Sequence, residues 1–232
     1  MWERSVEGRV LNFHLSGINN QNFIMRDEET GSWWQQVSGE CIAGPLKGKQ
    51  LRLVAHDELP FAVWKHEQPR GRVLKPDERV AAKYEPADWE DRYARLPVVT
   101  PVSPEDALKP RDLVIGITVN GAAKAYPMAR LVKQAPVGDR LGDTPLVLLL
   151  DPSKKSVRAF ESTVEGRALT LSARQDTSQF TDAETGSTWD FTGRAVSGPL
   201  AGRRLRSVPV LKDYWFDWKI YHPDTAIFNT DK

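Results

Sequence analysis

The sequence predicts a β-rich α+β fold: two tandem repeats of antiparallel strands, each followed by a short helix, packed as a pseudo-symmetric pair. Three observations lead to this prediction. A stretch in the first quarter of the chain recurs near its end. The apolar runs are short and are separated by glycine-containing turns, as in antiparallel sheets. A proline-rich stretch separates the two occurrences of the repeat.

The repeat is clearest over residues 27–51 and 182–205, where half of the aligned positions are identical with one gap. Both stretches contain the turn D-x-E-T-G-S-x-W and, further on, G-P-L-x-G. Beyond them the register continues without a gap from Arg52/Arg206 through Trp64/Trp218 to Pro69/Pro223. We therefore divide the chain into segment A (1–74, an N-terminally truncated copy), a linker (75–110) and segment B (111–232, a complete copy).

Each segment is expected to contain the same series of elements. In segment A the predicted strands cover 21–26, 33–37, 40–43, 50–54 and 72–74. The predicted helix of segment A follows Asp57, a suitable N-cap, and has Pro60 in its first turn. In segment B the predicted cap is Asp213, and Trp215 and Trp218 lie on one face of the helix because they are three residues apart. A last strand is predicted over 226–228.

Segment B begins with a stretch that segment A lacks. Two apolar runs, 113–119 and 146–150, predict strands. Asn120-Gly121 directly follows the first run and predicts a type I′ hairpin turn, in which both central residues need a positive φ, so the chain returns as a strand over 122–125. The linker holds six prolines, so we expect it to lie over the surface, with one short helix around 88–96.

Composition limits the classes of function. The chain has 232 residues, of which 40% are hydrophobic and 27% charged, values typical of a soluble globular protein. Lys and Arg (32) nearly balance Asp and Glu (31), which argues against a nucleic acid or a membrane surface as partner. No apolar run is long enough for a membrane span, and the charged start is unlike a signal peptide. We expect a cytoplasmic protein by default, or an exported one if the N-terminus is truncated. The sequence leaves the oligomeric state open.

The repeated turn supplies candidate metal ligands. Asp27 with Glu29, and Asp182 with Glu184, stand at positions i and i+2 and could hold a divalent cation such as calcium through oxygen ligands. The structural alternative is an Asp that accepts hydrogen bonds from its own turn. The four histidines show no zinc-ligand spacing, and phosphate-loop and serine-elbow motifs are absent from the sequence.

Aromatic residues are the candidates for contact with a small-molecule ligand. Trp33, Trp34, Trp189 and Tyr126 could each stack on a flat molecule, and core packing is the alternative for each of them. Trp33 has no aromatic counterpart in segment B. The single cysteine, Cys41, excludes an internal disulfide and is expected to be a small buried residue.

Taken together, these motifs resemble an uncharacterised bacterial family, Domain of Unknown Function 3179. The resemblance covers most of the chain and includes N-G-x-A-x-A-Y-P at 120–127 and W-x-x-x-H-P-D-T at 218–225. It implies a His-Glu pair and a Cys-Pro-x-Cys motif, groups that suit thiol redox chemistry or a soft metal. This sequence has Gln134-Ala135 and residues 151–154 (D-P-S-K) at those places.

Three hypotheses follow. The first is a non-catalytic module that binds a small-molecule ligand or a protein partner and has lost the family's Cys-x-x-Cys and His. The second is a metal-ion-dependent hydrolase of a small ester or lactone, in which the carboxylates of the repeated turn hold the cation. The third is a fragment of a thiol-redox or metal-binding protein.

Overall fold

The computed structural model describes residues 1–19, 22–100, 102–103, 105–175 and 177–229. Within these residues the strands form antiparallel pairs except for one parallel pair, and they assemble into four four-stranded sheets and two short hairpins. The protein is therefore β-rich with a few short helices, as the sequence predicts.

The N-terminal sheet has the strand order β3-β4-β5-β6 and is preceded by the hairpin β1-β2. Its elements are β1 (Ser5–Val6), β2 (Arg9–Val10), β3 (Phe13–Asn19), β4 (Asn22–Asp27), β5 (Trp33–Gln35) and β6 (Cys41–Ala43). The core of this region consists of Val6, Leu11, Trp34, Cys41, Leu46 and Leu51. Cys41 is fully buried, as expected.

A second sheet in segment B has the corresponding order β14-β15-β16-β17, after the hairpin β12-β13. Its elements are β12 (Thr163–Val164), β13 (Arg167–Ala168), β14 (Leu171–Ala173), β15 (Phe180–Asp182), β16 (Thr188–Trp189) and β17 (Ala195–Ser197). Trp189 is fully buried in its core, as Trp34 is in the N-terminal sheet.

Two further sheets lie in the middle of the molecule, with orders β19-β7-β8-β20 and β18-β11-β10-β9. Their strands are β7 (Leu113–Val119), β8 (Ala122–Pro127), β9 (Val137–Leu141), β10 (Thr144–Leu150), β11 (Val157–Glu161), β18 (Arg206–Val208), β19 (Leu211–Tyr214) and β20 (Ala226–Ile227). Alternate residues of β10 point into different cores: Leu146 and Leu148 pack with β7 and β8, whereas Val147 and Leu149 pack with the β14–β17 sheet. Burial on both faces explains why this strand is a continuous apolar run.

The helices are short: α1 (Phe61–Glu67), α2 (Trp89–Tyr93), α3 (Met128–Gln134) and α4 (Trp215–Tyr221), with a 3₁₀ helix at Glu78–Lys83. Trp215 and Trp218 of α4 are buried together against β7 and β8, as their spacing predicts. Gly116 of β7 makes room for this, because a Cβ there would lie 2.1 Å from the Trp218 ring. None of the helices in the described residues is long and apolar enough to cross a membrane.

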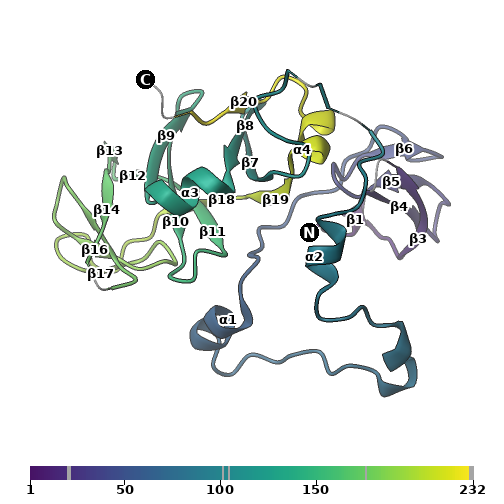
Figure 1. Cartoon of the computed structure of the whole chain (residues 1–232), viewed down its shortest axis with the longest axis horizontal. Coiled ribbons are helices and arrows are strands. Elements are labelled where there is room, and N and C mark those ends of the chain that lie inside the picture. Colours follow the sequence, from purple (N-terminus) through teal and green to yellow (C-terminus); the bar gives the residue numbers. More distant parts are fainter. Residues whose placement is uncertain (20–21, 101, 104, 176, 230–232) are drawn as a thin grey trace.

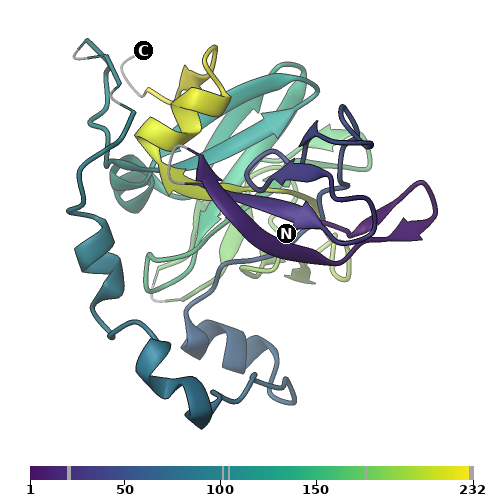
Figure 2. The same ribbon diagram turned by 90° about the vertical axis from the view of Figure 1, so that its right-hand side faces the viewer.

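The two corresponding sheets lie at opposite ends of the molecule, with the central sheets between them (Figures 1 and 2). The segments contact each other elsewhere. Segment A reaches α4 of segment B through hydrogen bonds from Asn22 and Gln35, and its α1 is joined to β11 by ion pairs of Arg158. Residues 75–100 of the linker run as a long excursion away from the sheets (Figure 2), whereas Val102 and Leu108 pack against the core beneath α4. The described part of the linker is largely exposed, as expected.

Several local predictions are confirmed, and others are wrong. Asn120 and Gly121 have φ values of 50° and 81° and close the β7–β8 hairpin. The strand predicted over 50–54 is reduced to isolated bridges, and 72–74 forms no strand. The caps are also wrong: α1 begins after Pro60 and α4 after Tyr214. Asp57 and Asp213 cap neither helix, because each carboxyl has another partner, described below.

Candidate functional site

The carboxylates of the repeated turn are occupied by hydrogen bonds from protein groups. Asp27 accepts hydrogen bonds from the Thr30 N–H (2.5 Å) and from the Trp34 indole N–H (2.8 Å). Asp182 accepts the corresponding bonds from Thr185 and Trp189 at the same distances. Burial alone would raise the pKa of both carboxyls, but these hydrogen bonds outweigh it and hold the pKa of each below its usual value.

Glu29 and Glu184 fasten the turn to a neighbouring segment. Glu29 accepts hydrogen bonds from the Asn12 backbone N–H (2.8 Å) and side-chain amide (2.7 Å), and Glu184 from the Thr170 N–H (2.8 Å). Across the described chain, no three His, Cys, Asp or Glu side chains come together in a way that could hold a metal ion. The contacts fit a structural role for the turn. The divalent-cation role stays a prediction, which the metal content of protein purified without chelator tests.

Of the four candidate aromatic residues, three are fully buried. Trp34 and Trp189 form the centres of their sheets' cores, and buried Tyr126 donates a hydrogen bond to Asp139 (2.8 Å). Trp33 is 37% exposed, with the Arg26 guanidinium 5.9 Å from the centre of its ring. A ligand in contact with the surface could therefore reach Trp33 but not the other three.

A cavity with a volume of about 720 Å³ lies between the N-terminal sheet and the region formed by β7, β19 and α4. None of the site residues predicted from the sequence lines it. The lining includes residues of β4 and β5 on one side and of β7, β19 and α4 on the other; its polar members include Asn22, Gln35, Gln36, Glu40, His56, Glu58, Lys212, Asp213, Asp217, Tyr221 and His222. Three parts of the chain far apart in sequence thus converge on one space.

Two side-chain amides of the N-terminal sheet bridge to α4 beside this cavity. The Asn22 amide donates a hydrogen bond to Asp217 Oδ1 (2.5 Å), and the Gln35 amide donates one to the Tyr221 hydroxyl (2.8 Å). Asn22 begins β4 and Gln35 ends β5. The side chains of a small sheet therefore hold the polar face of a helix almost 200 residues away.

Asp213 and Asp217 form a carboxyl pair in the wall of the cavity. Asp217 is 7% exposed, and Asp213 is partly buried at the end of β19. Burial and the neighbouring charge of Asp217 raise the pKa of Asp213 to about 8, and burial also raises the pKa of Asp217. Oδ1 of Asp213 accepts a hydrogen bond from the Tyr214 backbone N–H (2.7 Å). Because the pKa of Asp213 is raised beside Asp217, the pair shares one proton at neutral pH.

His222 completes this wall. Its imidazole lies against the Trp218 indole, with ring centres 3.8 Å apart. Burial lowers the pKa of His222, so the ring is neutral at pH 7. Trp218 is fixed in turn by its hydrogen bond to the Thr225 hydroxyl (2.9 Å).

The carboxyl pair differs from the residues at the matching positions of segment A. Asp213 and Asp217 align with Leu59 and Val63, which pack against the apolar core of segment B. At matching positions, then, one segment has two apolar side chains and the other has two carboxyls. This difference is the signal that sequence reasoning could have used to find the site.

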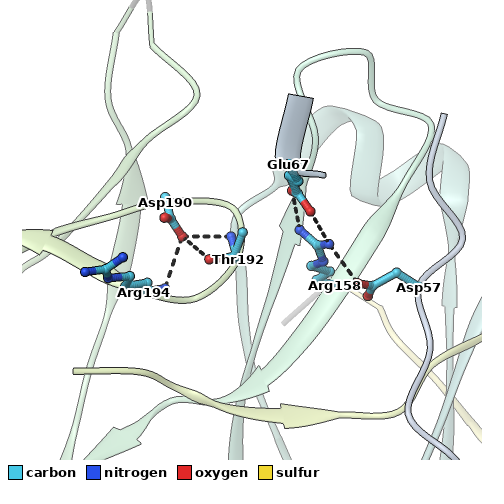
Figure 3. A network of polar contacts seen from close by, with 6 residues as sticks. All are labelled: Asp57, Glu67, Arg158, Asp190, Thr192 and Arg194. Carbon is cyan, nitrogen blue, oxygen red and sulfur yellow. Dashed lines mark hydrogen bonds and ion pairs between the residues drawn. The ribbon is translucent and has the colours of Figure 1, made fainter. Parts of the chain in front are cut away.

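A different polar cluster joins α1 to β11 (Figure 3), and Leu59 lies beside it. Arg158, 8% exposed, forms two hydrogen bonds with Glu67 (2.7 and 2.8 Å) and one with Asp57 (2.7 Å). Asp57 and Glu67 therefore have a cationic partner, whereas Asp213 and Asp217 form no ion pair with any of the described residues. This explains why Asp57 is not a helix cap.

The place where the family resemblance implies cysteines is a tight loop after β10. Asp151 is buried there and accepts hydrogen bonds from the backbone N–H groups of Ser153 (2.8 Å), Lys155 (2.8 Å) and Ser156 (2.6 Å). The carboxylate closes the loop, a structural role that a pair of thiols would not fill.

The fold and the cavity together define a β-rich protein of short antiparallel sheets with a polar pocket between its N-terminal sheet and its last helix. The chain belongs to the family described as protein of unknown function (DUF3179), which matches residues 1–225. Comparison with curated proteins and with solved structures gave no match.

Proposed function

We propose that this protein is a binding module that takes a small-molecule ligand into the 720 Å³ cavity between the N-terminal sheet and α4. The observation that carries this proposal is the carboxyl pair Asp213–Asp217 in the cavity wall, hydrogen-bonded to Asn22 of the opposite wall. Convergent polar groups with perturbed pKa values in a cavity are the usual mark of a binding site. The hydrolase and thiol-redox alternatives gain no support from the contacts described.

Stability does not explain the carboxyl pair. Burying an ionisable carboxyl without a cationic partner costs free energy, and apolar replacements of similar size are often neutral or stabilising. Leu59 and Val63 illustrate such an apolar solution at the matching positions of segment A. The carboxyls are therefore better explained by a role in binding than by a role in folding.

The pseudo-symmetric organisation belongs to the same proposal. We propose that segment A (1–74) and segment B (111–232) are copies of one unit joined by the linker (75–110). The matching hydrogen bonds of Asp27 and Asp182, and the shared strand order of the two sheets, support a common origin. Only one copy would then have kept or acquired the carboxyl pair.

The double variant Asp213→Leu/Asp217→Val tests the binding proposal, because it installs the residues of segment A at the cavity. A chemically diverse set of metabolites is screened by thermal shift against the wild type and this variant. The control, Asp88→Leu/Asp91→Val, makes the same substitutions at two exposed acids of the linker. We expect compounds that raise the melting temperature of the wild type and the control but not of the cavity variant. If every stabilising compound acts equally on all three proteins, the proposal is wrong.

A further inference from the structure

We infer that the cavity selects an organic cation with N–H donors, an ammonium or guanidinium group, and holds that group against Asp213 and Asp217. This inference rests on the proposed function and narrows its ligand to a chemical class. Three features of the cavity support it: the charges of its lining, its hydrogen-bonding groups, and the proton that the carboxyl pair shares.

The lining carries an excess of negative charge. Glu40 and Glu58 line the cavity in addition to the carboxyl pair. Lys212 is the one permanently cationic side chain among the described lining residues, and Met1, whose α-amino group has a pKa lowered by burial, also lines the cavity. His222, whose pKa is lowered by burial, adds no positive charge at neutral pH. A concave surface with low-dielectric walls and one dominant sign of charge attracts ligands of the opposite sign.

The hydrogen-bonding groups also fit a donor-rich cation. An ionised carboxylate only accepts hydrogen bonds, and a guanidinium presents several N–H groups that match two carboxylate oxygens at once. Asn22 occupies Oδ1 of Asp217 and the Tyr214 backbone N–H occupies Oδ1 of Asp213, so the second oxygen of each carboxyl is left for a ligand once the shared proton leaves. The aromatic rings of Trp2 and Tyr221 also line the cavity, and aromatic faces attract cations.

The shared proton occupies the position that a cation would take. Asp213 holds it because burial disfavours the charged carboxylate and because the charges of Asp217 and, more weakly, Glu58 disfavour a second negative charge. The other titratable groups of the cavity are Glu40, Lys212, Tyr221, the two histidines and the α-amino group of Met1. When a cation binds, the Asp213 carboxyl releases its proton to the buffer and the pair becomes a dianion, in which the single positive charge of the ligand takes the place of the proton. Affinity should therefore rise with pH until the pair is ionised in the free protein, at about pH 8.

The test compares two probes of nearly the same shape, n-butylguanidinium and its neutral counterpart n-butylurea. The guanidinium group stays charged throughout the pH range used, since its pKa is about 12 or higher. Titration calorimetry at pH 6.5 and pH 8.5, in buffers of different ionisation enthalpy, gives both the affinity and the number of protons released. We expect the cation to bind about tenfold or more tightly than the urea, to bind more tightly at pH 8.5, and to release a proton at pH 6.5.

Two variants connect the result to the cavity. Asp213→Asn keeps the shape of the side chain and Asp213→Leu/Asp217→Val removes both carboxyls, so both should lose the preference for the cation and its pH dependence. The linker control Asp88→Leu/Asp91→Val, with the same change in net charge as the double variant, should retain both properties.

Each other outcome overturns the inference in a recognisable way. Equal binding of butylguanidinium and butylurea, or tighter binding of the anion hexanoate, shows that the cavity does not select cations, although it still binds ligands. Binding of Ca²⁺ or Mg²⁺ that depends on Asp213, without binding of butylguanidinium, assigns the pair to a metal ion instead. If none of these probes binds, the inference fails, and the thermal-shift screen decides separately whether the proposed function stands.

Discussion

Replacing Asp213 by Asn should flatten the dependence of stability on pH. In the folded protein the pKa of Asp213 is raised from 3.8 to about 8 by burial and by Asp217. The folded state therefore binds a proton that the unfolded chain has already released. For an acid with a raised pKa, the associated stability is fully present below pH 3.8 and is lost as the pH rises to about 8. An asparagine has no such proton to lose.

The size of the effect follows from the linkage between protonation and folding. Within this window, each pH unit lowers the free energy of unfolding by up to about 1.4 kcal/mol. Between pH 5.0 and pH 7.5 the wild type should therefore lose about 2–3 kcal/mol through this group, after allowance for its partial exposure. The carboxyls with lowered pKa, such as Asp27 and Asp182, change their protonation in more acidic solution and contribute little between these two pH values.

Urea denaturation of the wild type and of Asp213→Asn at pH 5.0 and pH 7.5 measures this difference. Every other titrating group is present in both proteins. The difference between their two pH dependences of stability therefore reports on Asp213, together with its coupling to Asp217. We expect the wild type to lose at least about 1 kcal/mol more than the variant over this range. If the two proteins lose the same free energy to within about 0.5 kcal/mol, Asp213 does not hold a proton at neutral pH, and the reasoning about the pair is refuted.

Three further predictions concern the rest of the fold. Asp27→Asn and Asp182→Asn should each lower the free energy of unfolding by about 1–3 kcal/mol, since each weakens the charged hydrogen bonds to its turn; urea denaturation measures this, and a clearly smaller loss in both would argue against the structural role. Arg158→Met should increase amide hydrogen exchange in α1 about tenfold or more, because Glu67 loses its cation, and unchanged exchange would show that Arg158 does not hold the helix. Gly116→Ala should destabilise the protein by about 1–3 kcal/mol by colliding with Trp218, whereas Gly138→Ala, where a Cβ meets nothing within 4 Å, should be close to neutral in the same thermal unfolding assay.

Much of the β structure could be predicted because its signals are local. Asn120-Gly121 specifies a tight hairpin by its backbone preferences alone, and its φ values bear this out. The apolar run at 146–150 also predicts a strand, although its burial between two different cores is a tertiary fact that the run cannot reveal.

The predictions that failed depend on partners distant in sequence. Asp57 and Asp213 are good N-cap residues in isolation. In the fold, however, Asp57 pairs with Arg158, and Asp213 accepts a hydrogen bond from the Tyr214 N–H and neighbours Asp217. The strand predicted over 50–54 lacks the neighbour that its counterpart β18 finds in β11. In each of these cases a tertiary contact, or the lack of one, outweighs the local preference of the sequence.

The candidate site escaped prediction for the same reason, since no local motif links Asn22 to Asp217. One indication was nevertheless present in the sequence. The register between the segments places Leu59 opposite Asp213 and Val63 opposite Asp217. At these two positions, four residues apart, the side chains change from apolar to acidic, whereas the register around them is kept.

The bond between Asn22 and Asp217 joins residues 195 positions apart, which has a consequence for how the protein is made. While the ribosome is still synthesising the chain, the N-terminal sheet can form as soon as residues up to about 54 have emerged, but its Asn22 and Gln35 side chains then face water. The cavity exists only once the α4 segment has left the exit tunnel. Since contacts of such long sequence separation form slowly, a nascent chain halted before residue 211 would have a folded first sheet and no binding site.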